Sequence, residues 1–390
     1  MEKIIMIKYG ELTTKKGNRN FFVNTLYNNI KGKLDKIDYE IKKERSRMYI
    51  ISNNLDLVLE KLQEVFGIHE IDIVYKLDGK DFEVVKSNII DIFKEHDFKT
   101  FKVETNRADK DYPIDSMEIS RIIGGCLLKN YCDLSVDVRN PDRIINIDVR
   151  CEGIFVVSKK IKGLGGYPVG TLGRALAMLS GGIDSPVAIY MAMKRGVHVD
   201  CIYFDSPPHT NELALNKVKK LVKILSKYDS NIKLYVVNFT KMQEEIYKNK
   251  ADNYMITIMR RMMYRIASTY AKEVGYKLLI NGESIGQVAS QTLSSMYVIN
   301  DVTNIPVIRP VACLDKVEIM DIARKIGTYE TSILPYEDCC TIFLPKHPVI
   351  NPKLEIVDSI ESRFDYFTLT INAIDSICEV KIDEVETDLL

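Results

Sequence analysis

The residues best suited to chemistry form a short glycine-rich segment, LSGGIDSP, at 179–186. It stands between an apolar run typical of a strand and a helical pattern whose Pro186 suits a first turn. Free N–H groups at a helix start, glycines that let the backbone come close, and the hydroxyls of Ser180 and Ser185 favour a bound phosphate. A carboxylate beside phosphates needs a cation between them, so Asp184 indicates Mg²⁺. The alternative is a plain turn in which Asp184 caps the helix.

The segment differs from a Walker A loop, because no Gly-x-x-x-x-Gly-Lys-[Ser/Thr] pattern occurs in the chain. Transfer of a γ-phosphate therefore loses support. The segment instead resembles the pyrophosphate loop of ATP pyrophosphatases, enzymes that release pyrophosphate and leave AMP on a carbonyl oxygen. This resemblance implies that ATP binds here and that the substrate is adenylated.

Three longer segments resemble one family, the tRNA 4-thiouridine synthetases, and the likeness extends over essentially the whole chain. They are 8–19 (KYGELTTKKGNR), 281–296 (NGESIGQVASQTLSSM) and 335–342 (PYEDCCTI). The family implies an α/β protein with a ferredoxin-like domain over 1–75, a THUMP RNA-binding domain over 76–168 and an ATP-pyrophosphatase domain over 169–390. The last would be a Rossmann-like parallel-sheet domain of the adenine nucleotide alpha hydrolase type, preceded by two small α+β domains.

By this resemblance, a set of residues around the glycine-rich loop binds ATP. The set is Met178, Leu179, Ser180, Gly181, Gly182, Asp184, Ser185, Tyr203, Phe204, Arg260, Gly282 and Gln291. The residues themselves support part of it. Tyr203 and Phe204 end a predicted strand, where they could bracket adenine or equally belong to the sheet core. Arg260 interrupts an apolar helix face and could present its guanidinium to phosphate, with Arg261 as a solvent-facing neighbour.

Two further residues are expected to take part in catalysis. Lys316 opens a predicted helix, and the family pattern makes it an active-site lysine that works with Asp184 during adenylyl transfer. Without that pattern it is a solvated lysine. Sulfur delivery needs a thiolate, and the family's Cys-x-x-Ile pattern matches Cys339 and Ile342, which leaves Cys340 as a bystander. Acidic neighbours disfavour a thiolate, so its reactivity must come from groups that the sequence does not reveal.

The implied reaction is thiolation of the uridine at position eight of tRNA. The uracil oxygen at carbon 4 attacks the α-phosphate, and persulfide sulfur then displaces AMP from a base that has to be unstacked. Because the chain ends about fifty residues after Cys340, we expect no rhodanese domain. A cysteine desulfurase would then load Cys339, or free sulfide would serve. Cysteines spaced for an iron–sulfur cluster are not evident. A role in thiamine thiazole synthesis is a further family association.

Basic residues of the amino-terminal half are expected to contact tRNA phosphates. The candidates are Lys102, Arg107, Lys110, Lys15, Lys16 and Arg19. The first three belong to a segment that resembles a THUMP domain, which places them against the acceptor stem. Such contacts would position the RNA by shape, since proteins read an A-form helix poorly by sequence. Residues 1–50 contain 12 Lys and Arg against 6 Asp and Glu, which fits either phosphate contacts or a solvated face.

The elements that must position these groups follow from the apolar pattern. The amino-terminal half shows strands at 4–9, 39–43, 48–51, 100–105, 135–139 and 144–149, and helices at 20–30, 55–65, 83–93 and 116–127. Segment 162–170 holds four glycines and a proline, typical of turns, so the main boundary lies there. Beyond it, strands at 175–179, 199–204, 234–239 and 277–280 alternate with helices at 185–195, 211–227 and 255–274. This alternation indicates βαβ units in a parallel sheet covered by helices.

The amino-acid composition limits the classes of protein to which this chain can belong. The chain has 390 residues, of which 46% are hydrophobic and 28% charged, values typical of a globular protein with two or three domains. Its eight scattered cysteines show neither a disulfide framework nor zinc spacing. No signal or membrane segment is evident, so we expect a cytoplasmic protein without a membrane partner. The formal net charge is zero, so tRNA binding would depend on local charge. The family resemblance also implies a homodimer.

Two other functions remain open on the sequence. One is another pyrophosphate-loop reaction on tRNA, such as 2-thiolation or amidation of a carbonyl, although no glutaminase cysteine stands near the amino terminus. The other is a non-catalytic tRNA-binding module with a regulatory nucleotide site. The presence of Asp184, Lys316 and Cys339 together argues against that second alternative.

Overall fold

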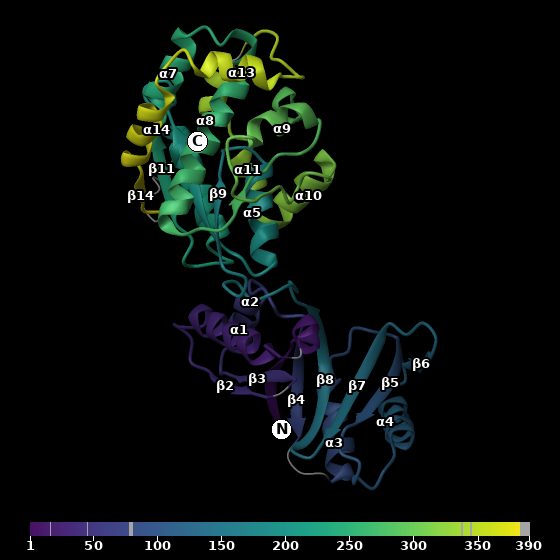
Figure 1. The fold of residues 1–390 in the computed structure, drawn as a ribbon. Coiled ribbons are helices and arrows are strands. Elements are labelled where there is room, and N and C mark those ends of the chain that lie inside the picture. The colour runs from purple at the N-terminus through teal and green to yellow at the C-terminus, as the bar shows by residue number, and fades with distance from the viewer. Residues whose placement is uncertain (16, 45, 78–80, 337, 344, 383–390) are drawn as a thin grey trace. The chain divides into compact units, whose positions relative to one another are not determined.

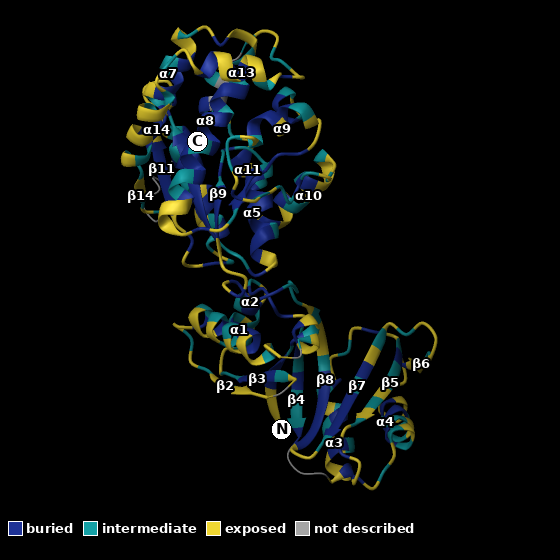
Figure 2. Cartoon of the chain, in the orientation of Figure 1, coloured by how far each residue is buried: buried dark blue, intermediate teal, exposed yellow. Residues whose placement is uncertain are grey.

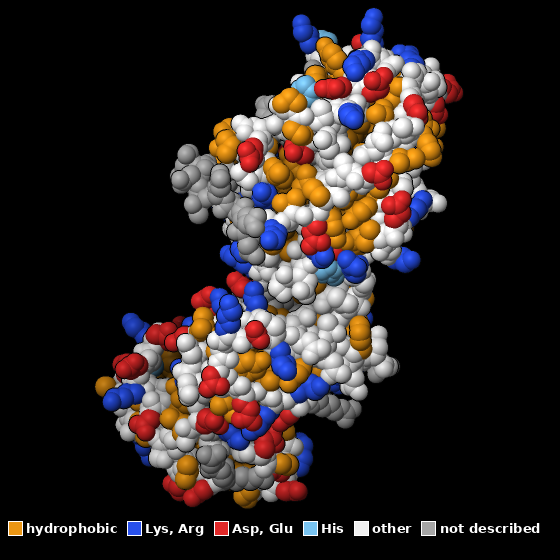
Figure 3. Space-filling model, turned by 90° about the vertical axis from the view of Figure 1, so that its left-hand side faces the viewer, with side chains coloured by type: hydrophobic (Ala, Val, Ile, Leu, Met, Phe, Trp, Pro, Cys, Tyr) orange, Lys and Arg blue, Asp and Glu red, His pale blue; other side chains and the backbone are white. Residues whose placement is uncertain are grey.

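The chain divides into two units, Met1–Pro168 and Val169–Leu390, in a computed structural model that describes residues 1–15, 17–44, 46–77, 81–336, 338–343 and 345–382 (Figure 1). The division falls inside the glycine-rich segment 162–170. On the face seen in Figure 3, basic and acidic side chains are interspersed rather than gathered by sign. Within the described ranges, no helix is both long enough and apolar enough to cross a membrane.

The first unit is built on one continuous eight-stranded sheet in the order β2-β3-β1-β4-β8-β7-β5-β6. Its strands are β1 (Glu2–Lys8), β2 (Glu40–Lys43), β3 (Arg47–Ile51), β4 (Glu70–Leu77), β5 (Thr100–Arg107), β6 (Ser135–Val136), β7 (Arg143–Arg150) and β8 (Gly153–Lys162). Its helices are α1 (Arg19–Lys33), α2 (Leu55–Leu62), α3 (Phe82–Ile92) and α4 (Ser116–Asn130). Because strand side chains alternate, Ile5 and Ile7 share a core with α1 and α2, whereas Ile4 and Met6 belong to a separate cluster.

This sheet bends sharply between its two halves. The ring of Tyr49 on β3 stacks on Phe155 of β8 with centroids 5.5 Å apart, and the Arg47 guanidinium on β3 lies 3.0 Å from Asp148 on β7. In a flat sheet, β3 and β7 would be about 19 Å apart. Strands β4 and β8 join the halves, and the apolar pattern predicts neither of them. The expected domain boundary after residue 75 falls inside β4.

The second unit contains a six-stranded sheet in the order β13-β12-β9-β10-β11-β14, parallel except for β14. Its strands are β9 (Arg174–Met178), β10 (His198–Asp205), β11 (Leu234–Asn238), β12 (Leu279–Ile280), β13 (Val307–Ile308) and β14 (Cys378–Val380). Its helices are α5 (Asp184–Lys194), α6 (Glu212–Leu225), α7 (Thr240–Lys248), α8 (Met255–Val274), α9 (Leu293–Asn300), α10 (Lys316–Ile326), α11 (Tyr329–Ser332), α12 (Cys339–Ile342), α13 (Leu354–Glu361) and α14 (Tyr366–Asp375). Figure 2 shows buried sheet strands and, on α7, α13 and α14, exposed outer positions. The predicted parallel sheet is confirmed.

The order of these strands creates a crevice suited to a ligand. The chain runs from β9 through β10 to β11 on one side and later returns to β12 on the other side of β9. In open α/β sheets, ligands bind outside the carboxyl ends of the strands where such a reversal occurs. The glycine-rich loop follows β9 and the segment from Asn281 follows β12, so both begin at this point.

Arg261 on α8 is buried, with 2% of its surface exposed, so the expectation that it faces solvent is wrong. Its Nε donates to Glu361 on α13 at 2.7 Å, and its Nη1 donates to the Val298 carbonyl at 2.6 Å. Arg265 pairs with the same Glu361 at 2.6 Å. Burial would raise the pKa of Glu361, but the two guanidinium groups lower it overall. Loss of Glu361 would remove the nearest carboxylate of a buried guanidinium, so the pair fixes where α13 packs on α8.

A second charge cluster lies at the amino-terminal edge of this sheet. His198, at the start of β10, contacts two carboxylates: Nδ1 lies 2.6 Å from Asp229 and Nε2 lies 3.2 Å from Asp200. Asp200 also accepts hydrogen bonds from the Tyr276 hydroxyl at 2.6 Å and from Arg174 at 2.9 Å. Burial alone would lower the pKa of His198, but the two carboxylates raise it to about 9. His198 is therefore protonated in the folded chain at neutral pH.

We expect this cluster to make stability fall at alkaline pH. The folded pKa of His198 lies above the ordinary value of 6.5, so its contribution is complete below pH 6.5 and is lost as the pH rises through 9. By linkage the loss is roughly 3 kcal/mol, measurable by urea unfolding of the full chain. His198→Gln should flatten this pH dependence, whereas His209→Gln, at a more exposed pair with Glu244, should leave it unchanged. An equally steep decline in His198→Gln would contradict the assignment.

Candidate functional site

The crevice in the second unit contains a cavity of about 380 Å³. The loop after β9, the end of β10, helix α8, the segment after β12 and the start of α12 surround it. The lining residues are Met178, Leu179, Ser180, Gly182, Asp184, Ser185, Tyr203, Phe204, Arg260, Met263, Asn281, Gly282, Val288, Gln291, Asp338 and Cys339. Eleven of the twelve residues predicted to bind ATP are among them. The exception, Gly181, donates its N–H to Asp338.

The glycine-rich loop is shaped by its own serines. The Ser180 N–H donates to Ser185 Oγ at 3.0 Å, and the Gly182 N–H donates to Ser180 Oγ at 3.4 Å. Helix α5 begins at Asp184, so this residue lies inside the first turn rather than at the cap position. The N–H groups of residues 180–182 are thus all bound within the protein, and the loop places the positive end of α5 beside the cavity, which suits phosphate.

Gly282 brings the segment after β12 against the start of α5. A Cβ atom at Gly282 would lie 2.6 Å from both the backbone N and the Cα of Ser185, and 2.9 Å from the carbonyl carbon of Asp184. These are backbone atoms, which cannot rotate away as a side chain could. Any larger residue would push the helix start aside, so the identity of Gly282 is a packing requirement of the crevice.

Asp184 and Lys316, predicted as an electrostatic pair, are in direct contact. Lys316 Nζ donates to Asp184 Oδ1 at 2.6 Å, and Gln287 Nε2 donates to Oδ2 at 3.0 Å. Lys316 is the first residue of α10, whose start is closed by a capping box between Asp315 and Glu318. The cap fixes where the lysine leaves the helix. The side chains are 40% exposed for Lys316 and 18% for Asp184, so a ligand can reach the pair.

Glu283 is a buried acid that the sequence motifs do not single out, and it fixes the direction of the Arg260 side chain in the cavity. Glu283, whose side chain is 1% exposed, accepts hydrogen bonds from Arg260 at 2.8 Å, from Arg309 at 2.7 Å and from the Tyr264 hydroxyl at 3.1 Å. Asn281 donates to the same hydroxyl at 2.8 Å. Burial and the charge of Glu283 raise the pKa of Tyr264, so its hydroxyl stays protonated. The only sequence signal for Glu283 is its place directly after Gly282.

Cys339 lies in the same cavity as the loop. It is 3% exposed and begins α12, and its carbonyl accepts a hydrogen bond from Gln243 Nε2 at 2.6 Å. The preceding residue, Asp338, accepts from the Gly181 N–H with both carboxylate oxygens, at 2.9 and 3.1 Å. The two residues are 157 positions apart, so local sequence motifs do not predict this contact and indicate Asp338 only as an acidic neighbour of Cys339. The side chain of Cys340 lies outside the described part of the chain.

Tyr203 and Phe204 are almost fully buried at the end of β10, with 1% and 4% of their surfaces exposed. Successive strand residues point to opposite faces of the sheet, so the two rings do not flank one planar base. Phe204 packs edge-on against Phe239 with centroids 5.5 Å apart. Tyr203 instead lies near Asp338, and its hydroxyl lowers the pKa of that carboxyl group against the larger effect of burial. Phe204 therefore packs in the sheet core and also lines the cavity.

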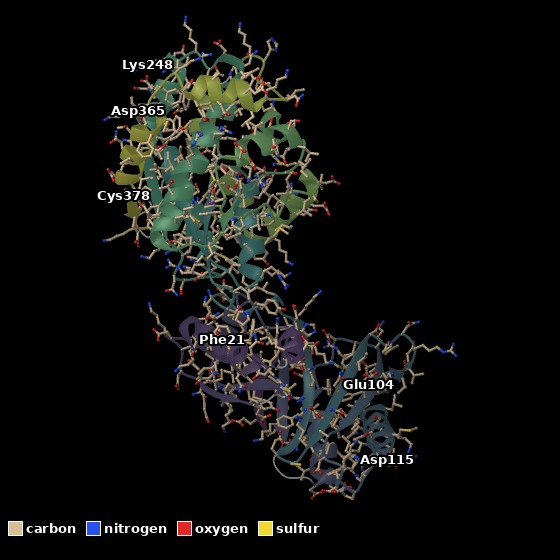
Figure 4. All side chains as sticks on the ribbon, in the orientation of Figure 1. Phe21, Glu104, Asp115, Lys248, Asp365 and Cys378 are labelled. Atoms are coloured by element: carbon tan, nitrogen blue, oxygen red, sulfur yellow. The ribbon has the colours of Figure 1, made fainter. Side chains whose placement is uncertain are left out.

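The predicted THUMP-side cations do not share one surface. Lys102 and Arg107 stand five places apart on β5 and so lie on opposite faces of the sheet. Lys102 pairs at 2.9 Å with Glu104, which is labelled in Figure 4, and Arg107 donates to the Tyr112 carbonyl at 2.8 Å. Lys110 is exposed in the following loop. The first two cations are therefore engaged within the protein.

Lys15 and Arg19 are placed differently. Together with Lys43 they line one cavity of about 840 Å³ in the first unit. The Lys15 ammonium also lies over the ring of Tyr167, 4.6 Å from its centroid. Lys16, predicted with them, lies outside the described residues. This cavity is the place where the structure gathers predicted RNA-binding cations.

Comparison with known proteins covers both units. A family model described as "Thiamine biosynthesis protein (ThiI)" matches residues 170–366, one described as "ThiI ferredoxin-like domain" matches 4–71, and one described as "THUMP domain" matches 79–158. The chain is 48% identical to a probable tRNA sulfurtransferase of Thermoanaerobacter sp. (strain X514), over 97% of this chain and 100% of that protein. It is 45% identical to a probable tRNA sulfurtransferase of Geobacillus kaustophilus (strain HTA426), over 97% and 96% of the two lengths.

A solved structure extends this likeness to three dimensions. A 4-thiouridine synthetase, crystallised as an RNA complex with bound ATP, matches with a TM-score of 0.89 and 38% identity over 98% of this chain and 100% of that one. The residues matched by the first family model include the glycine-rich loop, Gly282, Lys316 and Cys339. The chain therefore belongs to the ThiI family, with ferredoxin-like and THUMP domains ahead of a pyrophosphate-loop domain.

Proposed function

We propose that this chain is an ATP-dependent tRNA sulfurtransferase that makes 4-thiouridine. The observation that carries the proposal is that Cys339 lines the same cavity as the glycine-rich loop. A site that only bound nucleotide would not require a sulfur atom there. The relatives named tRNA sulfurtransferase and the 4-thiouridine synthetase with bound ATP support the same reaction.

The first step is adenylation of the base. The oxygen on carbon 4 of the uracil attacks the α-phosphate of ATP, a new oxygen–phosphorus bond forms, and pyrophosphate leaves. The start of α5 presents the positive end of its helix dipole to the leaving phosphates. Arg260, whose direction Glu283 fixes, and Lys316 are the cations that offset charge on the phosphate oxygens. AMP then remains on the base as a leaving group.

The second step is transfer of sulfur. The outer sulfur of a Cys339 persulfide attacks carbon 4, AMP leaves, and the base is joined to Cys339 through a disulfide. A second thiol then attacks the Cys339 sulfur, releases 4-thiouridine and forms a new disulfide with Cys339, which a further external thiol reduces before the next cycle. Because Cys339 is only 3% exposed, the cavity keeps water away from the adenylated base. A cysteine desulfurase is the proposed persulfide donor. In the alternative, free sulfide attacks carbon 4 directly and displaces AMP, without a persulfide on Cys339.

We propose that Mg²⁺ enters the site with ATP. This ion is commonly held by one or two carboxylates together with substrate phosphates rather than by an all-protein cage. Among the described residues, no group of three or more His, Cys, Asp and Glu side chains could hold a metal. Asp184 is the carboxylate that fits, because it lines the cavity beside the loop and is partly exposed. The ion would neutralise phosphate charge during adenylation.

The wider setting is also part of the proposal. We propose domains at 1–75, 76–168 and 169–390, a homodimer in the cytoplasm, and the uridine at position eight as the target. The RNA in the similar synthetase structure supports tRNA as the partner. Lys15, Arg19 and Lys110 are the cations proposed to contact it. The family description also supports a contribution of sulfur to the thiazole of thiamine.

The reaction can be tested with the wild-type protein, ATP, Mg²⁺, unmodified tRNA and a desulfurase with cysteine. Cys339→Ser should keep tRNA-dependent pyrophosphate release but lose thiolation by at least ~100-fold, because the base is activated without a sulfur carrier. Mass spectrometry of digested tRNA measures the product. Cys340→Ser and the exposed Cys313→Ser are the matched controls, and both should stay active.

Three results would change the proposal. Loss of thiolation in Cys340→Ser alone would transfer the carrier role to Cys340. Sulfur found on carbon 2 of the base would replace the reaction by a 2-thiolation. Absence of tRNA-dependent pyrophosphate release in the wild type would leave a non-catalytic tRNA-binding module.

Lys316→Gln should slow tRNA-dependent pyrophosphate release by about 100-fold, because Asp184 and the phosphates then lose a shared cation. ATP affinity, measured by calorimetry, should fall less than the rate. Lys325→Gln changes an exposed lysine near the end of the same helix and should have no effect. A normal rate in Lys316→Gln would show that the contact with Asp184 plays no part in adenylation.

Replacing Lys15→Gln and Arg19→Gln together should weaken tRNA binding about tenfold and reduce its salt dependence, because two phosphate contacts are lost. ATP affinity should not change, since both residues belong to the first unit. Lys36→Gln, at an exposed lysine that does not line the cavity, is the control. An equal loss in Lys36→Gln would assign the effect to diffuse charge instead of this cavity.

A further inference from the structure

The Gly181 N–H, a donor well placed for phosphate, is bound by a carboxylate of the chain itself. Asp338 accepts from it with both oxygens, at 2.9 and 3.1 Å. Asp338 is directly followed by Cys339, the first residue of α12. An anion on the loop and the proposed sulfur carrier are therefore neighbours in the chain, and a movement of one moves the other.

The Asp338 carboxylate is held at a cost in solvation. Burial raises the pKa of Asp338, and the Gly181 N–H, Lys217 and Tyr203 offset this only in part. Release into water would remove that cost, so a stronger anion can displace the carboxylate. Lys217 would stay behind, because it is a buried residue of helix α6, and its Nζ would remain bound to the Leu334 carbonyl at 2.8 Å. Its Cε would lie only 3.2 Å from a Cβ at Gly181, so its stem flanks the loop.

The segment that carries Cys339 packs in the apolar core of the second unit and is tied to α6, where Lys217 Nζ donates to the Tyr336 carbonyl at 3.4 Å. The Cys339 carbonyl accepts from Gln243, and Phe343 meets the rings of His209 and Tyr247 with centroids 5.2 and 5.0 Å apart. Helix α12 spans four residues, which is too short to be rigid by itself. A second cavity of about 760 Å³, lined in part by Phe343 and Tyr247, borders the end of α12. The segment therefore has room to shift.

A phosphate of ATP and the Asp338 carboxylate cannot both occupy the Gly181 N–H, since each brings negative charge to one donor. We propose that Asp338 is an internal substitute for phosphate, which keeps Cys339 buried until ATP displaces it. ATP binding then exposes Cys339 to the persulfide donor, and Lys217 takes up the incoming phosphate. When pyrophosphate leaves, Asp338 returns to the loop and brings the loaded Cys339 back beside the adenylated base. This inference rests on the proposed function and assigns Asp338 a positioning role.

Nucleotide binding tests the competition between the two anions. Asp338→Asn should bind ATP about tenfold more tightly in calorimetry, as expected if the carboxylate occupies the loop in nine molecules of ten. Lys217→Gln should bind ATP more weakly. Asp365→Asn, at a remote carboxylate that also accepts a backbone N–H (Figure 4), should not change affinity. If Asp338→Asn strengthens ATP binding and Lys217→Gln weakens it, a general loss of structure cannot explain both effects. Thermal unfolding of the two variants would check that each is folded.

Thiol labelling tests the movement. In a Cys340→Ser background, the alkylation rate of Cys339 is followed by peptide mass spectrometry. The buried thiol should react slowly alone and at least ~5-fold faster with Mg²⁺ and a non-hydrolysable ATP analogue, because the open form becomes the main population. AMP, which lacks the leaving phosphates, should not accelerate it. Asp338→Asn should react quickly without nucleotide.

The results of these two experiments can overturn the role of Asp338 without affecting the proposed thiolation reaction. Weaker ATP binding by Asp338→Asn would mean that the carboxylate supports the nucleotide instead of competing with it. Slower alkylation with the analogue would mean that ATP merely covers the thiol. Either result would overturn the inference while thiolation by the wild type still supported the reaction. A wild-type protein that bound no ATP would remove both.

Discussion

The missing side chain at Gly282 is the constraint on which the crevice of the second unit depends. Its backbone approaches the first turn of α5 so closely that a Cβ would lie 2.6 Å from Ser185 backbone atoms. This approach joins the segment after β12 to the loop after β9, at the point where the strand order reverses. Glu283 follows at once and binds Arg260 and Arg309, so the same contact also sets the direction of a cation that lines the cavity.

The parts of this site that the sequence predicts are those encoded locally. A strand, a glycine-rich loop and a helix with Pro186 in its first turn lie within a few residues of each other, and the structure places them as expected. Contacts between distant segments could not be predicted. The bond from Gly181 to Asp338 and the burial of Arg261 under α13 depend on how later helices pack, and residue type does not encode that. An arginine in an amphipathic helix is usually exposed to solvent, and the prediction for Arg261 relied on this tendency. The packing of α13 over α8 buries this particular arginine, so the prediction is wrong.

The first unit shows the same limit in its sheet. Buried charge interrupts the apolar pattern of β4, because Asp72 is fully buried and pairs with Lys8 at 2.8 Å. The strand β4, which pairs with β8 where the two halves join, therefore escapes the periodicity. The expected ferredoxin-like and THUMP folds are present, but they share one bent sheet, and the Arg47–Asp148 pair crosses the bend. This continuity favours a single body for RNA recognition over two modules on a linker.

The cations around the glycine-rich loop are paired with carboxylates before any nucleotide arrives, and this pairing determines which contacts ATP can replace. Each cation there has a carboxylate neighbour: Arg260 has Glu283, Lys316 has Asp184, and Lys217 has Asp338. Glu283 is 1% exposed and bound by two arginines and a tyrosine, so it cannot leave without leaving buried cations unpaired. The Asp184–Lys316 pair is partly exposed, and Asp338 directly precedes the four-residue helix α12. The phosphates therefore compete with these two carboxylates, and only the second of them is joined directly to the cysteine.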